Sequence, residues 1–221
     1  MEPDNKIPFN FGSAATGFTK SEREKMPELS LASYMKLVEP LAQETEHETG
    51  IYYLVPIIQS AHESRAGNSG LAKEHGNLFG IVATDSWKNA GRPIAYMPTW
   101  EVITTKKPIE IFYPKAEEKN SIYHKPPEIL EKWADKADGA TVHKIKIYPH
   151  REFRAYPTWR DSFFDWGRLI STLRVYRDAY EKLKNKDTVR DGINLMAGTY
   201  ATDPRYARSL LILWDKLNGQ G

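Results

Sequence analysis

The sequence contains no cysteine, so neither a disulfide framework nor a thiolate metal site can form. Histidine is scarce as well, and its six residues show no paired ligand spacing. His62 precedes Glu63, but Ala66 stands where a helical zinc-protease motif needs its second histidine. We therefore expect neither a metal nor any other cofactor.

Long apolar runs are also absent. The longest covers residues 51–58, is interrupted by Pro56, and falls short of the roughly 20 residues that a membrane span needs. Residues 1–30 contain no apolar stretch as long as that of a secretory signal peptide. We expect no membrane span and see no signal for Sec-dependent export.

An excess of charge of either sign is missing too. The 31 basic residues are interleaved with 29 acidic ones, and the formal net charge is +2. This balance gives no basic surface of the kind that nucleic acids require. A chain of 221 residues with 40% hydrophobic residues can bury a real core. We expect a monomer that binds no nucleic acid.

The N-terminal third predicts an arm followed by two helices. Residues 1–29 have few apolar residues with any period, so they are interpreted as an irregular arm. Ser30 then caps a helix that ends near Gly50 and that Pro40 should bend or interrupt. The helix over residues 51–64 is apolar nearly all round, which places it in the middle of a domain.

The middle of the chain is typical of short strands. Residues 87–112 and 143–156 contain extended pieces bounded by turn signals, with Ile111 among the expected strand residues. The polar segment between them is interpreted as an insertion around residues 113–143, with a short candidate helix over residues 126–137.

Helical periodicity returns in the C-terminal third. Thr158 is a plausible N-cap with Asp161 three residues later, and a shorter helix follows over residues 189–196. A last helix is predicted with Asp203 as N-cap and Pro204 at its first position. The fold class is α+β and mainly α, with a small antiparallel sheet.

Several short sequence motifs, in chain order, resemble those of the glucosaminidase family of peptidoglycan hydrolases, which is similar to glycoside hydrolase family 73. They are "IIQSAHES", "SGLAKEHGNLFGI", "WEV", "FRAYPTWRDSFFDW" and "YATDPRYA". The resemblance runs from roughly residue 30 to residue 218. It implies a lysozyme-like helical domain with a β-hairpin lobe over residues 30–221. It also implies an endo-β-N-acetylglucosaminidase that cuts the glycan strands of bacterial cell wall.

Glu63 is the expected catalytic glutamate of this resemblance. The residues themselves support the assignment, because a carboxyl at the C-terminal end of a buried helix has its pKa raised by desolvation and by the helix dipole. Glycosidic cleavage needs such a protonated acid to deliver a proton to the leaving oxygen. The family's second carboxylate falls on Glu101, with Glu110 as the competitor, and its tyrosine beside the glutamate falls on Tyr200.

Aromatic side chains that lie flat against sugar rings are expected along the substrate groove. The candidates are Phe79, Tyr96, Trp100 and Tyr206. Asn77 either contacts sugar or stabilises the turn before "LFGI". The chain departs from the family after Ser64, because Arg65 and Ala66 stand where glycine and tryptophan are frequent.

The second carboxylate could activate water, act as a nucleophile, or leave the attack to the acetamido group of the substrate. A muramidase or lytic transglycosylase of the same fold is the nearest alternative, and a non-catalytic wall-binding module is the alternative from another class. Because the wall lies outside the cytoplasmic membrane, we expect delivery by cell lysis or by another route outside Sec export. An immunity protein is a possible partner.

Overall fold

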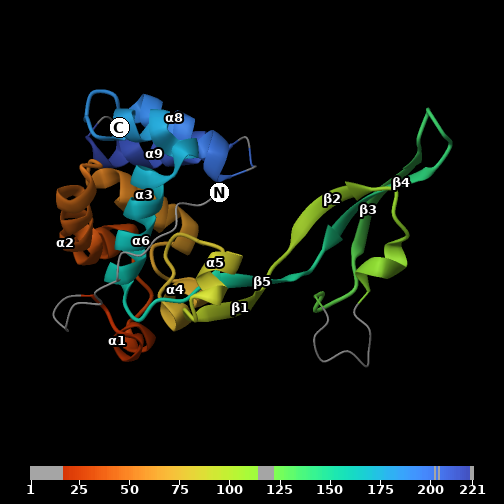
Figure 1. Cartoon of the computed structure of the whole chain (residues 1–221), viewed down its shortest axis with the longest axis horizontal. Coiled ribbons are helices and arrows are strands. Elements are labelled where there is room, and N and C mark those ends of the chain that lie inside the picture. Colours follow the sequence, from red (N-terminus) through yellow and green to blue (C-terminus); the bar gives the residue numbers. More distant parts are fainter. Residues whose placement is uncertain (1–16, 114–121, 202, 204, 220–221) are drawn as a thin grey trace. The chain divides into compact units, whose positions relative to one another are not determined.

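The computed structural model describes residues 17–113, 122–201, 203 and 205–219 (Figure 1). They fall into two compact units. The helical unit comprises the described residues up to Ile81 together with those from Arg154 onward, and the sheet unit comprises Val82–Phe153. Much of the predicted N-terminal arm, and residues 114–121 of the predicted insertion, lie outside the described residues.

The helical unit packs its helices around α3 (Figure 1). Contacts with α3 come from α2, α6 and α9. The elements are α1 (Lys20–Lys25), α2 (Leu31–Thr49), α3 (Leu54–Ser64), α4 (Gly70–His75), α6 (Trp159–Thr172), η2 (Arg174–Tyr176), α7 (Arg177–Leu183), α8 (Val189–Tyr200) and α9 (Tyr206–Leu217). Among the helices of the described ranges, none combines the length and the apolar character that crossing a bilayer requires.

The α2 helix confirms its predicted ends. The Ser30 hydroxyl accepts a hydrogen bond from the Ser33 amide, and Gly50 ends the helix in the left-handed region at φ 75°. The expected interruption at Pro40 does not occur, because α2 runs unbroken from residue 31 to residue 49. Pro40 lies on the exposed side of α2, where water can satisfy the carbonyl group that loses its helical partner.

The α3 helix is the buried centre that its apolar sequence predicts. Its buried residues include all of Leu54 to Ala61, so even the polar Gln59 and Ser60 are fully enclosed. The same core contains large aromatic side chains, among them Trp159, Phe163 and Trp166, which are each 0% exposed. The side chains of Gln59 and Ser60 must therefore find their partners inside the protein.

The C-terminal helices confirm two predictions and correct a third. The α6 helix begins with the predicted Thr158 cap, and α8 covers the expected segment and extends to Tyr200. The α9 helix begins at Tyr206 with Arg205 at the N-cap position, so Asp203 is not the cap. Asp203 instead accepts hydrogen bonds from the backbone and side chain of Arg205. The predicted first helical position, Pro204, lies outside the described residues.

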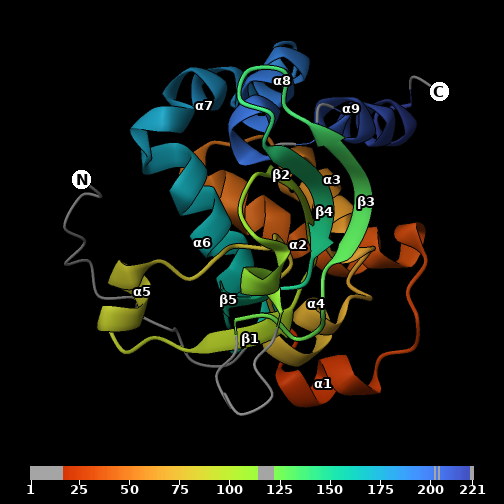
Figure 2. The same cartoon turned by 90° about the vertical axis from the view of Figure 1, so that its right-hand side faces the viewer.

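The sheet unit contains a three-stranded antiparallel sheet in the order β2-β4-β3, with β4 in the centre (Figure 2). A separate pair joins β1 to β5. The elements are α5 (Asp85–Asn89), β1 (Ile94–Pro98), β2 (Glu101–Thr105), η1 (Ile109–Phe112), β3 (Glu128–Ala134), β4 (Thr141–Ile147) and β5 (His150–Arg154). Buried Phe112, Ile145 and Ile147 form its small core.

Two sequence predictions in this unit are wrong. The helix expected over residues 126–137 is the strand β3, because its residues pair antiparallel with β4, Ile129 with Ile145 and, beyond a register shift, Trp133 with Val142. Every residue of β3 is exposed, so the segment lacks the buried alternation that identifies a strand from sequence. Ile111, expected in a strand, belongs to the short helix η1.

Candidate active site

Glu63 lies in the last turn of α3, one residue before the helix ends. Its carboxyl is partly buried. This burial raises its pKa, and the nearby Tyr206 hydroxyl opposes the shift only in part. Glu63 therefore keeps its proton to a higher pH than an exposed glutamate does.

The loop after α4 approaches Glu63 through a glycine. A Cβ atom placed on Gly80 would lie 3.6 Å from Glu63 Oε2, and Gly80 has φ +65°. Asn77 shapes this loop: its amide nitrogen donates to the carbonyls of Ile81 and Arg154, and its amide oxygen accepts from the Phe79 and Ile81 amides. With 1% exposure, Asn77 has no surface for sugar and stabilises the turn, the other of the two expected roles.

Tyr200, the last residue of α8, fixes the same loop from the other side. Its hydroxyl donates a hydrogen bond to the Phe79 carbonyl at 2.7 Å. Burial, and next the negative charge of Glu63, raise the pKa of Tyr200 well above its ordinary value. Tyr200 therefore stays a neutral donor and holds the Gly80 loop in place beside the carboxyl.

Two of the expected sugar platforms are core residues instead. Phe79 is 0% exposed and stacks on Trp166 at 5.1 Å between ring centroids, with Phe163 edge-on at 5.2 Å. Tyr206 is 6% exposed, and its ring lies parallel to that of Tyr200 at 6.1 Å. A ring face that is covered by protein cannot receive a sugar, so the substrate-stacking assignment is wrong for both.

The chain leaves α3 through three consecutive residues in the left-handed region. Arg65 has φ 53°, Ala66 φ 54° and Gly67 φ 77°. The Ser64 hydroxyl fastens this turn by donating to the Ser60 carbonyl at 2.6 Å and accepting from the Gly67 amide at 2.7 Å. The left-handed conformation is costly for residues with a Cβ atom, so the turn carries strain directly after Glu63.

Replacing Arg65 with glycine is expected to stabilise the protein. Glycine adopts φ 53° without the Cβ penalty, so we expect the free energy of unfolding to rise by about 1 kcal/mol. Arg65→Ala is the matched control, because it removes the same side chain but leaves a Cβ atom in the left-handed region. Urea unfolding of both variants measures the difference, and an equal change in the two would contradict the strain argument.

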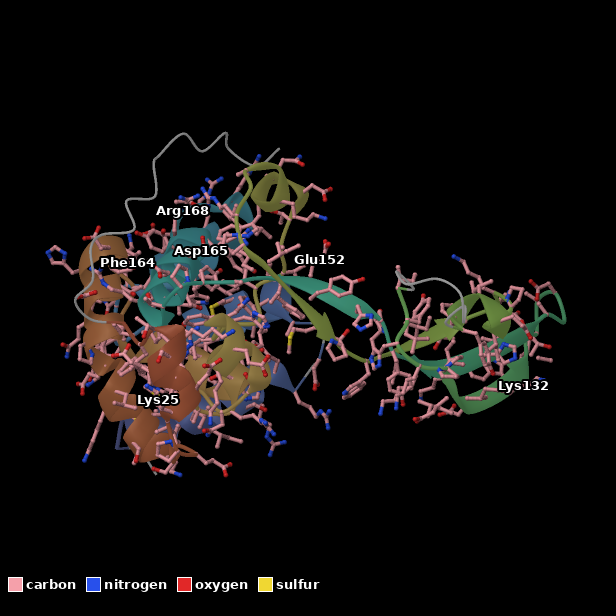
Figure 3. The ribbon with its side chains drawn as sticks, turned by 90° about the horizontal axis from the view of Figure 1, so that it is seen from below. Lys25, Lys132, Glu152, Phe164, Asp165 and Arg168 are labelled. Carbon is pink, nitrogen blue, oxygen red and sulfur yellow. The ribbon has the colours of Figure 1, made fainter. Side chains whose placement is uncertain are left out.

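A buried ion pair within the helical unit joins Arg154 to Asp165 of α6. Arg154 Nη1 lies 2.8 Å from Asp165 Oδ2, and the exposed fractions of the two side chains are 8% and 1%. The Tyr156 hydroxyl donates to the same carboxylate oxygen at 2.6 Å. Figure 3 labels Asp165 on α6. Because the Arg154 carbonyl also accepts from Asn77, this pair anchors the loop that borders Glu63.

The sheet unit holds the remaining predicted residues. Glu101 begins β2, and its Oε2 accepts from Arg151 Nη2 at 2.7 Å. Its competitor Glu110 is exposed on η1. The two aromatic candidates keep open ring surface: Tyr96 is 53% exposed and stacks on His150 on one face, and Trp100 is 62% exposed beneath the Lys146 ammonium.

The sequence analysis did not identify the buried residues that contact the elements around Glu63. Gln59 lies four positions before Glu63, on the same face of α3, and its Oε1 accepts from the Trp166 indole at 3.0 Å. A polar residue one turn from the glutamate within an apolar run was the available signal. The Arg154 and Asp165 pair gave none, because 11 positions separate them and only the fold joins them.

No three histidine, aspartate or glutamate side chains within the described ranges converge to hold a metal ion. The neighbours of Glu63 include the Tyr206 hydroxyl and the backbone at Gly80. Such a surrounding suits a carboxyl that gives and takes a proton.

The chain is similar in sequence to bacterial proteins that act on the cell wall. The chain is 26% identical to an autolysin of Enterococcus faecalis over 217 residues, which are 95% of this chain and 23% of that protein. It is 25% identical to the peptidoglycan hydrolase FlgJ of Salmonella typhimurium over 181 residues, 80% of this chain and 43% of that protein. The chain thus spans less than half the length of these curated relatives.

Solved structures share the fold. The catalytic domain of the autolysin Auto from Listeria monocytogenes superposes with a TM-score of 0.56 at 20% identity, covering 89% of this chain and 90% of that one. The glycoside hydrolase domain of Salmonella typhimurium FlgJ gives 0.53 at 19% identity, with 86% and 90% covered. The model of the family Glucosaminidase, described as mannosyl-glycoprotein endo-beta-N-acetylglucosaminidase, matches residues 39–219. The chain therefore belongs to the Glucosaminidase family of glycoside hydrolases.

Proposed function

We propose that this protein is a peptidoglycan hydrolase that cleaves glycan strands as an endo-β-N-acetylglucosaminidase, with Glu63 as the general acid. The observation that carries the proposal is the surrounding of Glu63 in a chain of this family. Burial raises its pKa, the Gly80 loop approaches its carboxyl, and Tyr200 holds that loop. The curated relatives are an autolysin and a peptidoglycan hydrolase, which supports the bacterial wall as the substrate.

The reaction begins with protonation of the glycosidic oxygen. A raised pKa keeps the Glu63 proton available, and transfer of this proton lets the leaving sugar depart as positive charge develops on the ring. The uncharged tyrosines beside Glu63 place no fixed positive charge there, and such a charge would draw the proton off early. Departure leaves Glu63 as a carboxylate, which can regain a proton from the attacking water.

Glu101 is the proposed second carboxylate. Its Oε2 pairs with Arg151, and a carboxylate at this place can stabilise the developing positive charge or activate water. Tyr96 and Trp100 are the proposed sugar platforms, since each leaves about half or more of its side chain accessible. The wall outside the cytoplasmic membrane is the proposed place of action.

Purified sacculi test the function directly. We expect soluble fragments whose reducing end is N-acetylglucosamine, identified by mass spectrometry after borohydride reduction. N-acetylmuramic acid at the reducing end would make the protein a muramidase, and an anhydro end would make it a lytic transglycosylase. Binding to the wall without release of soluble fragments would contradict the proposed enzymatic activity and indicate a non-catalytic wall-binding module. The anomeric configuration of the first product reports whether the reaction inverts or retains.

The rate should fall on the alkaline side as Glu63 loses its proton. Because burial raises its pKa, we expect the midpoint of this decline above the ordinary range of glutamate. The free energy of unfolding should also fall as pH rises. A carboxyl whose pKa is raised in the folded state stabilises the fold below its unfolded pKa, roughly 4.3. This contribution is lost as pH rises through the folded pKa. Urea unfolding from pH 4 to pH 8 should show this loss, and Glu63→Gln should lack it.

A further inference from the structure

Two polar atoms lie buried and unpaired next to Glu63. Within the part of the chain that the structure describes, neither the Gln59 amide nitrogen nor the Tyr206 hydroxyl reaches a partner in full hydrogen-bonding geometry. Gln59 is 0% exposed and Tyr206 is 6% exposed, so water at the surface does not serve them. Unpaired polar groups at this depth destabilise the fold, so each needs an explanation.

The Trp166 indole fixes the orientation of the Gln59 side-chain amide. The indole nitrogen can only donate a hydrogen bond, and it lies 3.0 Å from Gln59 Oε1. The oxygen end of the amide is therefore fixed on Trp166, and the nitrogen end, which only donates, is left for the Tyr206 hydroxyl. A hydroxyl that accepts from this nitrogen has its own proton free for another acceptor.

That acceptor is Glu63. Burial is the main cause that raises the pKa of Tyr206. Glu63 raises it further, as an acceptor of its proton does, and the Gln59 amide lowers it, as a donor to its oxygen does. The Tyr206 hydroxyl in turn lowers the pKa of Glu63. The directions of the three side-chain effects agree with donation from Gln59 to Tyr206 and from Tyr206 to Glu63.

We propose that Gln59 and Tyr206 are positioning residues that hold the Glu63 carboxyl through a directed relay of hydrogen bonds, which starts at the Trp166 indole. Closing the relay satisfies both unpaired atoms at once. The Tyr206 ring is fixed for this task by stacking on Tyr200 and by the edge of His62 at 5.3 Å. The proposal rests on Glu63 as the general acid.

Two other titratable groups flank the Tyr206 ring beside Glu63, and Asp165, Arg154 and Tyr176 act on one of them, Tyr200. Tyr200 belongs to α8 and bonds the Phe79 carbonyl, and His62 precedes Glu63 on α3. Desolvation lowers the pKa of His62, and Asp203 opposes this shift. Any of these groups could titrate in a pH profile, so the test must observe Glu63 itself.

The first measurement is the pKa of Glu63 by NMR, with glutamate labelled at its carboxyl carbon and the signal assigned by its loss in Glu63→Gln. Tyr206→Phe removes the donor to the charged carboxylate, so we expect the Glu63 pKa to rise by on the order of one unit. Tyr34→Phe is the matched control: it deletes another buried hydroxyl, which belongs to α2 and faces Ser60 and Ser64 of α3 and not Glu63. It should leave the Glu63 pKa in place.

The second measurement tests the direction of the relay. Gln59→Met, which keeps the length of the side chain, should shift the Glu63 pKa upward by a smaller amount than Tyr206→Phe. Added to Tyr206→Phe it should produce no further shift, because Gln59 acts only through the hydroxyl. An unchanged Glu63 pKa in Tyr206→Phe, or additive shifts in the double variant, would overturn the relay.

Activity on sacculi separates the relay from the proposed function. If the protein is active, the alkaline decline of kcat/KM in Tyr206→Phe should shift to higher pH by the same amount as the Glu63 pKa measured by NMR. Circular dichroism checks that the variant is folded. If wild type releases nothing from sacculi while the NMR shift is present, the function fails and the relay stands. If wild type is active and the shift is absent, the relay fails and the function stands.

Discussion

Replacing Glu63 by glutamine should reduce fragment release from sacculi by about 100- to 10,000-fold, the usual contribution of a general acid. Glutamine keeps the size of the side chain and its place on α3 but cannot deliver a proton. Initial rates of muropeptide release, measured with circular dichroism as a folding control, give the loss. The prediction has the largest effect on activity because departure of the leaving sugar depends on this proton.

Glu46→Gln is the matched control for this result. Burial also raises the pKa of Glu46, a glutamate of α2, yet it belongs to a different helix from the candidate acid. We expect the rate of Glu46→Gln to stay within about twofold of wild type. Glu101→Gln gives a graded comparison, since its residual rate measures how much the second carboxylate contributes. Equal losses in the Glu63 and Glu46 variants would argue for a structural effect and against acid catalysis.

Replacing Arg154 by methionine should cause the largest loss of stability, about 3–5 kcal/mol in the free energy of unfolding. The substitution leaves the Asp165 carboxylate in the core without its guanidinium partner at 2.8 Å. The Tyr156 hydroxyl still donates to that carboxylate, but a neutral donor does not balance its charge. Urea unfolding at pH 7 measures the effect.

Arg190→Met serves as the control for the ion pair. Arg190 also pairs with a carboxylate, that of Asp215, but the exposed fractions of the two side chains are 48% and 35%. Water screens such a pair, so its loss should cost less than about 1 kcal/mol. Equal losses for the two arginine variants would mean that burial does not make the Arg154 pair special. A stable Arg154→Met with reduced activity would instead place its role in holding the Gly80 loop.

The sequence located the helices well where one face is buried and the ends are marked. Ser30 and Gly50 bound α2 because capping and left-handed termination depend on local chemistry. The strand β3 was missed for the opposite reason. Its side chains are all exposed, so only pairing with β4 makes it a strand, and such pairing leaves no apolar period in the sequence.

The site divides in the same way. Glu63 could be chosen from the sequence because its position at the end of an apolar helix already predicts desolvation and a raised pKa, and because its motif resembles a family. The exposure of individual aromatic side chains could not be predicted from the sequence, because aromatic residues occur both in cores and on surfaces. Tertiary packing buried Phe79 and Tyr206 and left Tyr96 and Trp100 open.

The sequence by itself therefore determined the family, the mainly helical fold and the candidate acid, because these follow from local periodicity, caps and short motifs. Only the tertiary structure decided what surrounds that acid. Tyr206 follows Glu63 by 143 positions and Trp166 follows Gln59 by 107, and folding alone brings them together. Hydrogen-bond direction and burial are properties of such contacts, so they arise when the chain packs and have no counterpart in its order of residues.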